Sequence, residues 1–214
     1  MRFGIDHHAV VRRALGGGGE YADLFIEEAA PLSIVCEDGR IEKVLAGAET
    51  GAGIRLIRGL RTAYAYTNEI TTASLLELAD AVRGAFRDGS DAAPVVRLVR
   101  KHPAIGADIR KPAETVPTAA KVDLVAQAER IARRIDLRIR QVQVVYRENR
   151  QQIEIAGSGG TLVVDDRHYL TAVVQVIAAA DGIMQTGYEP VGGLIGMELF
   201  DREPLEQAAE TAAR

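Results

Sequence analysis

Three side chains near the start of the chain could in principle bind a metal ion, because they combine a carboxylate with two imidazoles. Asp6, His7 and His8 are consecutive residues. Adjacent side chains of a helix point about 100° apart, so these three cannot readily face one ion. The simpler interpretation is that they belong to the first turn of an opening helix.

A second cluster and a lone thiol are the other candidates for chemistry. Asp165, Asp166 and His168 suit a metal better, since a turn can bring carboxylates and an imidazole together. The alternative is a hydrated turn between two apolar strands. Cys36 lies in an apolar stretch with no neighbouring His or Lys to lower its pKa, which favours an inert core thiol over a nucleophile.

The motifs of well-known enzyme classes are absent from the sequence. No histidine is followed by glutamate, so the HExxH pattern of zinc proteases does not occur. The glycine runs 16–19 and 157–160 do not join a strand to a following helix, and there is no GK[ST] sequence to bind phosphate. No Ser-His-Asp set can be assigned among four histidines. The residues alone therefore predict a domain without an evident active site.

Composition narrows the class of protein. The 214 residues are 47% apolar, which is enough for a sizeable core, and their net charge of -4 comes from interspersed charges. A nucleic-acid surface would need a basic stripe, so we expect no nucleic-acid partner. No run reaches the roughly 18 apolar residues of a membrane helix, and the N-terminus is too polar for a signal peptide. With one cysteine, a soluble cytoplasmic protein is expected.

Hydrophobic periodicity in the first half predicts a helix and then a meander of about four strands. Apolar residues at helical spacing over 5–15 indicate the helix, which the glycine run ends. Residues 21–36 are strand-like, and Asp38-Gly39 provides a hairpin turn before Ile41. Two further strands, 50–57 and 62–67, flank a turn at 58–61.

Two longer helices are predicted next. One is capped by Thr71 or Thr72, has an apolar stripe from Leu75 to Phe86 and stops at Asp88-Gly89. Residues 102–117 contain three prolines and suggest a linker or edge-crossing loop. The other helix covers Thr118–Ile135. Its apolar stripe is Val122, Leu124, Val125, Ala128, Ile131, Ala132 and Ile135, and its expected wet residues are Lys121, Glu129, Arg130, Arg133 and Arg134.

From Arg138 onward the apolar period changes to two, which predicts four or five consecutive strands. The expected reversals are 147–150, 157–160, 165–168 and 181–182. Strands segregated from helices favour an α+β fold with two layers, an antiparallel sheet and helices packed on one face. The expected organisation is a first half over about 1–100, the linker and a second half over about 118–200. The last residues, 203–214, form a helix without a C-terminal cap, which suggests a chain cut from a longer protein.

Seven segments of the chain carry a family resemblance through their sequences and their order: Glu20–Glu27, Cys36–Glu42, Gly51–Gly59, Ala63–Asn68, Ala156–Gly160, Asp165–Arg167 and Asp181–Gly187. Together they resemble the N-terminal domain of the TldD/PmbA metalloprotease family, whose older description is modulator of DNA gyrase. The resemblance covers nearly all of the chain, and the Tyr-Thr-Asn sequence favours the TldD branch.

The resemblance implies a non-catalytic domain of a zinc metallopeptidase that processes peptides or unfolded proteins as a homodimer or a TldD/TldE-type heterodimer. In the TldD branch the metal is held by an HExxxH helix and a Cys in a later domain, so no catalytic, cofactor-binding or metal residue transfers to this chain. The alternatives are an inactive TldE/PmbA-type partner and a protein-binding module acting on DNA gyrase.

Five residues of the resembling segments are candidates for a role in this domain. Gly51, Gly53 and Gly59 would serve strand bends and a turn. Arg55 and Tyr66 could face a peptide channel or a partner subunit, although half-exposed strand residues are the simpler interpretation.

Overall fold

The computed structural model describes residues 2–16, 18–86, 96–101 and 106–214. Within them, the chain forms two compact units, each made of three separate segments. The first unit comprises Met1–Ala29, Ala48–Gly106 and Gln151–Asp166, and the second comprises Ala30–Gly47, Ala107–Arg150 and Arg167–Arg214. The predicted helix end at Asp88-Gly89 and residues 102–105 of the predicted linker lie outside the described residues.

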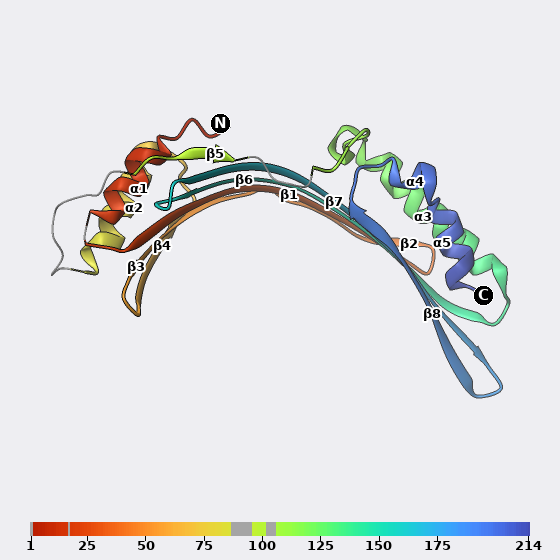
Figure 1. The fold of residues 1–214 in the computed structure, drawn as a ribbon. Helices are drawn as coiled ribbons and strands as arrows, with labels where there is room; N and C mark the ends of the chain where they lie inside the picture. The colour runs from red at the N-terminus through yellow and green to blue at the C-terminus, as the bar shows by residue number, and fades with distance from the viewer. Residues whose placement is uncertain (1, 17, 87–95, 102–105) are drawn as a thin grey trace. The chain divides into compact units, whose positions relative to one another are not determined.

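Eight strands of the described residues belong to one sheet, with the order β4-β3-β1-β6-β7-β5, β2 paired to β1 and β8 paired to β7 (Figure 1). The predicted α+β class with an antiparallel sheet is confirmed. One pairing differs, because β5, which the sequence did not predict, runs parallel to β7. The strands are β1 (Tyr21–Glu37), β2 (Arg40–Ala46), β3 (Glu49–Arg58), β4 (Arg61–Thr67), β5 (Val99–Lys101), β6 (Ile139–Gly157), β7 (Thr161–Ala180) and β8 (Ile183–Leu194).

The first unit packs α1 (His7–Leu15) and α2 (Thr72–Gly84) against one face of its strands. Asp6 caps α1, since its carboxylate accepts from the backbone N–H of Ala9 at 2.9 Å. Thr71, one of the two predicted caps, starts α2 in a capping box with Ser74. The helices bury alternate strand residues, of which Leu24, Ile26, Ile54 and Leu56 are almost fully buried. The side chains between these buried residues point to the other face of the sheet, away from the two helices.

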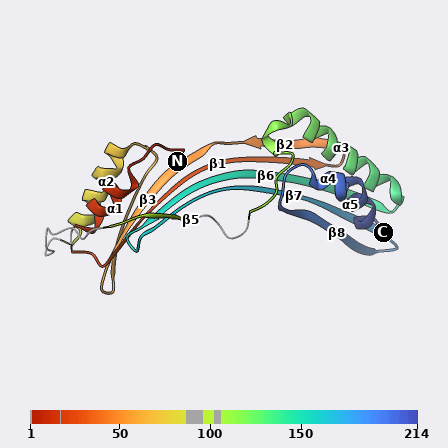
Figure 2. The same cartoon turned by 45° about the horizontal axis from the view of Figure 1, so that its top comes forward.

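The second unit contains α3 (Thr118–Ile135), α4 (Leu199–Arg202), α5 (Leu205–Ala212) and a short 3-10 helix, Ala113–Thr115. Figure 2 shows α3 and α5 lying side by side. The bounds predicted for α3 are confirmed. Two of its expected wet residues are not exposed, since Lys121 is 2% and Glu129 1% exposed. Each lies beside an opposite charge, Lys121 with Glu148 and Glu129 with Arg133, which makes burial tolerable.

The predicted turns at Asp38-Gly39 and Asp181-Gly182 are confirmed. All four residues have positive φ, as a two-residue hairpin turn of type I′ needs. The simple meander was wrong in one respect, because β2 and β3 do not pair with each other. Both pair with β1, which at 17 residues is long enough for the two in succession.

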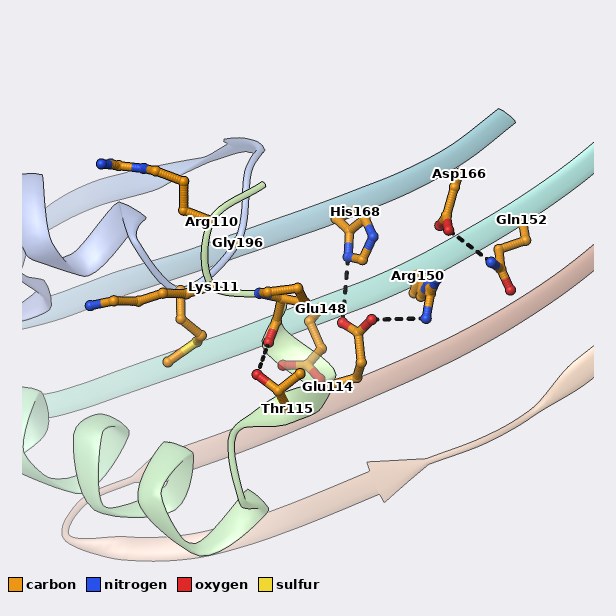
Figure 3. A network of polar contacts seen from close by, with 12 residues as sticks. Arg110, Lys111, Glu114, Thr115, Glu148, Arg150, Gln152, Asp166, His168 and Gly196 are labelled. Carbon is orange, nitrogen blue, oxygen red and sulfur yellow. Dashed lines mark hydrogen bonds and ion pairs between the residues drawn. The ribbon is translucent and has the colours of Figure 1, made fainter. Parts of the chain in front are cut away.

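Two predicted reversals were wrong, because residues 147–150 lie inside β6 and residues 165–168 lie inside β7. Their polar side chains have partners outside their own strands. Arg150 pairs with Glu114 at 3.0 Å, and Asp166 accepts from Gln152 at 2.8 Å (Figure 3). A run of charges therefore does not end a strand whose side chains find partners elsewhere.

Gly187 of β8 is expected to be essential to the packing of α5. A Cβ added there would lie 1.7 Å from the carbonyl oxygen of Ala212, so Gly187→Ala should lower the free energy of unfolding by about 1–3 kcal/mol. Urea denaturation followed by circular dichroism measures this. Gly193→Ala in the same strand is the control, because its Cβ would meet only one side-chain atom, at 4.0 Å. Equal effects of the two variants would contradict the packing argument.

Candidate functional site

The three polar residues at the start of α1 have three different partners. Asp6 is the helix cap, and the His8 ring bonds to the carbonyl of Val96. His7 is 2% exposed, and its Nε2 lies 2.6 Å from Oε2 of the equally buried Glu154, although the two atoms do not meet hydrogen-bond geometry. The structure therefore does not bring Asp6, His7 and His8 onto one ion.

The cluster Asp165, Asp166 and His168 lies in β7 rather than in a turn. Successive strand residues point to opposite faces, so Asp165 and Asp166 cannot both face one ion. His168 Nδ1 lies 3.4 Å from a carboxylate oxygen of Glu114, the residue that also holds Arg150 (Figure 3). His168 therefore belongs to an ion-pair network that joins β6, β7 and the short 3-10 helix.

The described residues do not offer a site that fits a zinc ion. Among them, no group of three or more His, Cys, Asp or Glu side chains could hold a metal. Cys36 is buried in the core of the second unit, and burial raises the pKa of its thiol. This is the environment of an inert thiol, as the sequence indicated.

The residues singled out in the resembling segments gather on two neighbouring strands of the first unit. Gly51, Gly53 and Arg55 belong to β3, and Tyr66 lies on β4. Gly59 is in the turn that joins these strands and has a φ of +57°, which L side chains rarely adopt. Arg55 and Tyr66 project from the face that α1 and α2 leave uncovered, so this face is the candidate site.

Arg55 makes a two-pronged ion pair with Asp23 across β3 and β1, with a closest distance of 2.5 Å. The hydrogen bond to this carboxylate raises the pKa of the guanidinium. The arginine side chain is 49% exposed, so water screens the pair. The contact holds the arginine in one orientation more than it stabilises the fold.

We expect Arg55→Met to lower the free energy of unfolding by no more than about 1 kcal/mol, because exposed ion pairs contribute little. Thermal unfolding at low and high salt would measure it. The control is Arg13→Met, which removes the ion pair of a similarly exposed arginine with Asp80. A loss several times larger than that of the control would mean that Arg55 has a structural role.

Besides the predicted Tyr66, this face carries aromatic side chains that were not predicted from the sequence as candidates. Tyr64 and Tyr66 are 64% and 78% exposed, and their ring centroids lie 6.4 Å apart. Tyr21 and Phe25, both 37% exposed, lie on β1 in the same unit. The signal was their even spacing within strands, which puts each pair on one face.

Two sequence models cover most of the chain and decide its family. The model for PmbA/TldA metallopeptidase domain 1 matches residues 22–86, and the model for the central domain matches residues 111–214. The chain belongs to the PmbA/TldD family. The resemblance inferred from the sequence is thus confirmed.

Curated relatives of the PmbA/TldD family include the metalloprotease TldD homolog of Haemophilus influenzae, which is 29% identical over 85% of this chain. A metalloprotease of Methanothermobacter thermautotrophicus is 26% identical over 88% of the chain. The chain spans 38% and 40% of the lengths of these two relatives.

Solved structures share the fold at low sequence identity. A candidate modulator of a DNA gyrase from Thermotoga maritima aligns over 90% of this chain and 43% of its own, with a TM-score of 0.70 and 15% identity. TldE from Thermococcus kodakarensis aligns over 94% of this chain and 46% of its own, with a TM-score of 0.69 and 13% identity. In the part of the chain that the structure describes, no helix has the length and apolar character to span a membrane.

Proposed function

We propose that this chain is the non-catalytic N-terminal part of a TldD-like zinc metallopeptidase that processes peptides or unfolded proteins in the cytoplasm. The observation that carries the proposal is the 29% identity to a relative named as a metalloprotease TldD homolog. That relative is more than twice as long as the matched region, so its name describes a protein with further segments.

The side chains that could act as metal ligands or nucleophiles are buried or lie beside other charged groups, and this supports a non-catalytic role. The imidazoles of His7 and His168 lie beside Glu154 and Glu114, and Cys36 is buried. A ligand set that fits zinc is not found among the described residues, so the proposal places zinc in another part of the parent protein and assigns no reaction step to this chain.

Exposed apolar side chains on β8 support a role in assembly. Ile183, Met184, Tyr188 and Leu194 are 49–70% exposed on a strand that, among the described residues, pairs with β7 alone. Exposed apolar residues along a strand favour association with another chain. We propose that the partner is a second copy or a TldE-type subunit, and that the assembled chains enclose the substrate.

The test is cleavage of an unfolded protein, such as reduced and denatured casein, by the complete gene product, alone and mixed with a TldE-type subunit. We expect cleavage that a zinc chelator abolishes and added zinc restores. Asp166→Asn and His168→Gln should leave the zinc content unchanged. No cleavage, with or without the TldE-type subunit, would overturn the peptidase proposal. Loss of zinc from these two variants would overturn the non-catalytic role.

A further inference from the structure

The uncovered face of the first unit contains a hollow of about 250 Å³ above β1, β3 and β4. Six of the residues that line it determine which ligand it could bind: Phe25, Glu27, Gly51, Gly53, Tyr64 and Tyr66. The volume is below the roughly 300–1,000 Å³ of ordinary small-molecule sites. The hollow therefore suits a single side chain of a larger ligand rather than a whole cofactor.

Two glycines form the floor of the hollow. In the sheet register, Gly53 lies between Phe25 of β1 and Tyr66 of β4, and Gly51 lies opposite Glu27. The Tyr64 ring lies over Gly53, where an added Cβ would come within 2.4 Å of the tyrosine oxygen. Above Gly51, by contrast, an added Cβ would meet only a backbone oxygen at 3.7 Å, so the space there is open.

The walls are aromatic and exposed. Tyr64 and Tyr66 are stacked with an interplanar angle of 27°, and both present most of their surface to water. Phe25 lies on the other side of the glycine strand. Neighbouring aromatic rings left in water, with space between them, are typical of a recognition surface.

The charge of the hollow is negative. Glu27 is the ionisable acid of its lining, and the Gln151 amide donates to its Oε1 at 2.6 Å, which fixes the carboxylate. Among the described residues that line the hollow there is no Lys, Arg or His. Arg55, on the same face, is held by Asp23 and does not line it. The carboxylate is thus not neutralised by a basic residue of the lining.

We propose that this hollow binds the cationic side chain of a lysine or arginine in an extended polypeptide. A cation over aromatic faces is attracted by their π electrons, and a nearby carboxylate adds direct charge attraction. An acidic ligand would meet repulsion from Glu27, and an apolar one would leave that carboxylate buried without a partner charge. The polypeptide nature of the ligand rests on the proposed function, whereas the preference for a cation rests on the hollow alone.

The experiment measures binding of short glycine-serine peptides with blocked termini to the complete gene product by fluorescence anisotropy. The peptides differ only at a central residue, which is lysine, the neutral analogue norleucine, or glutamate. We expect the lysine peptide to bind roughly 10-fold more tightly than the norleucine peptide, with the preference weakening as salt increases. Equal binding of all three peptides would overturn the proposal.

Three variants locate the preference. Glu27→Gln keeps the contact to Gln151 without the charge, Tyr66→Ala removes one wall, and Gly51→Val fills the open floor with a residue that strands favour. Each should remove most of the roughly 10-fold preference for lysine over norleucine. Tyr169→Ala, at an exposed tyrosine of β7 to which no binding role is assigned, is the matched control and should keep it.

The outcomes separate this inference from the proposed function. Cleavage of unfolded protein without a preference for lysine would overturn the cation hollow and leave the peptidase proposal standing. A lysine preference that the hollow variants abolish, in a protein that cleaves nothing, would support the hollow and overturn the peptidase proposal. If Tyr66→Ala instead changes the sedimentation of the protein and not its peptide binding, the hollow is a contact between copies and the inference is wrong.

Discussion

Replacing Lys121 by methionine is expected to lower the free energy of unfolding by about 3–5 kcal/mol, because it leaves a buried carboxylate without its counter-charge. Lys121 Nζ lies 2.7 Å from Oε1 of Glu148, with side-chain exposures of 2% and 9%. The hydroxyl of the fully buried Tyr146 donates to the same carboxylate, and burial, more than this contact, raises the pKa of that phenol. Removing the lysine therefore disturbs a network inside the second unit.

Urea denaturation of Lys121→Met measures this effect, and Lys111→Met provides the matched control. Lys111 also pairs with a carboxylate, that of Asp201, at 2.5 Å, but both side chains are more than half exposed. Lys111→Met should therefore lower the free energy of unfolding by less than about 1 kcal/mol.

Adding Glu148→Gln to Lys121→Met should recover part of the loss, because glutamine keeps an acceptor for Tyr146 and carries no charge. A loss of under 1 kcal/mol in Lys121→Met, or no recovery in the double variant, would mean that burial of the charge is not what makes this lysine important.

The helices and tight turns were accessible from the sequence because local residues determine them. The period of apolar residues placed α3, the last residues were predicted to contain the helix that is α5, and a capping threonine placed the start of α2. Asp38-Gly39 and Asp181-Gly182 were recognisable because aspartate and glycine tolerate the positive φ of a hairpin turn.

The long strands and the buried charges were not accessible, because their partners are distant in the sequence. Lys121 looks like a solvent-facing helix residue until Glu148, 27 positions away, is brought beside it. The polar residues of β6 and β7 look like turns for the same reason. His7 and Glu154 are 147 positions apart in the sequence. The periodicity of a local segment does not indicate which distant charged residue the fold will bring beside it.

Part of the candidate site could be predicted from the sequence. The resemblance drew attention to Gly51, Gly53, Arg55 and Tyr66, and all four lie on two adjacent strands. The hollow could not be derived, because it depends on the register that sets Gly53 between Phe25 and Tyr66. Shifting that register by one residue would turn the aromatic side chains to the other face.

Glu198 joins two loops of the second unit through its carboxylate. The side chain is 1% exposed, and it accepts backbone N–H groups of Arg110 at 3.1 Å, Lys111 at 2.8 Å and Gly196 at 3.3 Å. Burial raises the pKa of this carboxyl, but the backbone donors, its own among them, outweigh burial and lower the pKa to about 2.

Because the pKa of Glu198 is lower in the folded chain than its ordinary 4.5, the carboxylate stabilises the fold at pH values above 4.5. That contribution is lost as the pH falls through 4.5 towards 2. We expect Glu198→Gln to lower the free energy of unfolding by about 3 kcal/mol at neutral pH and by progressively less on acidification. Urea denaturation of the unmodified protein and the variant across this pH range measures the difference, and Glu203→Gln, at an exposed glutamate, is the control. A difference that does not change with pH would mean that the backbone donors hold the neutral side chain as well as the charged one.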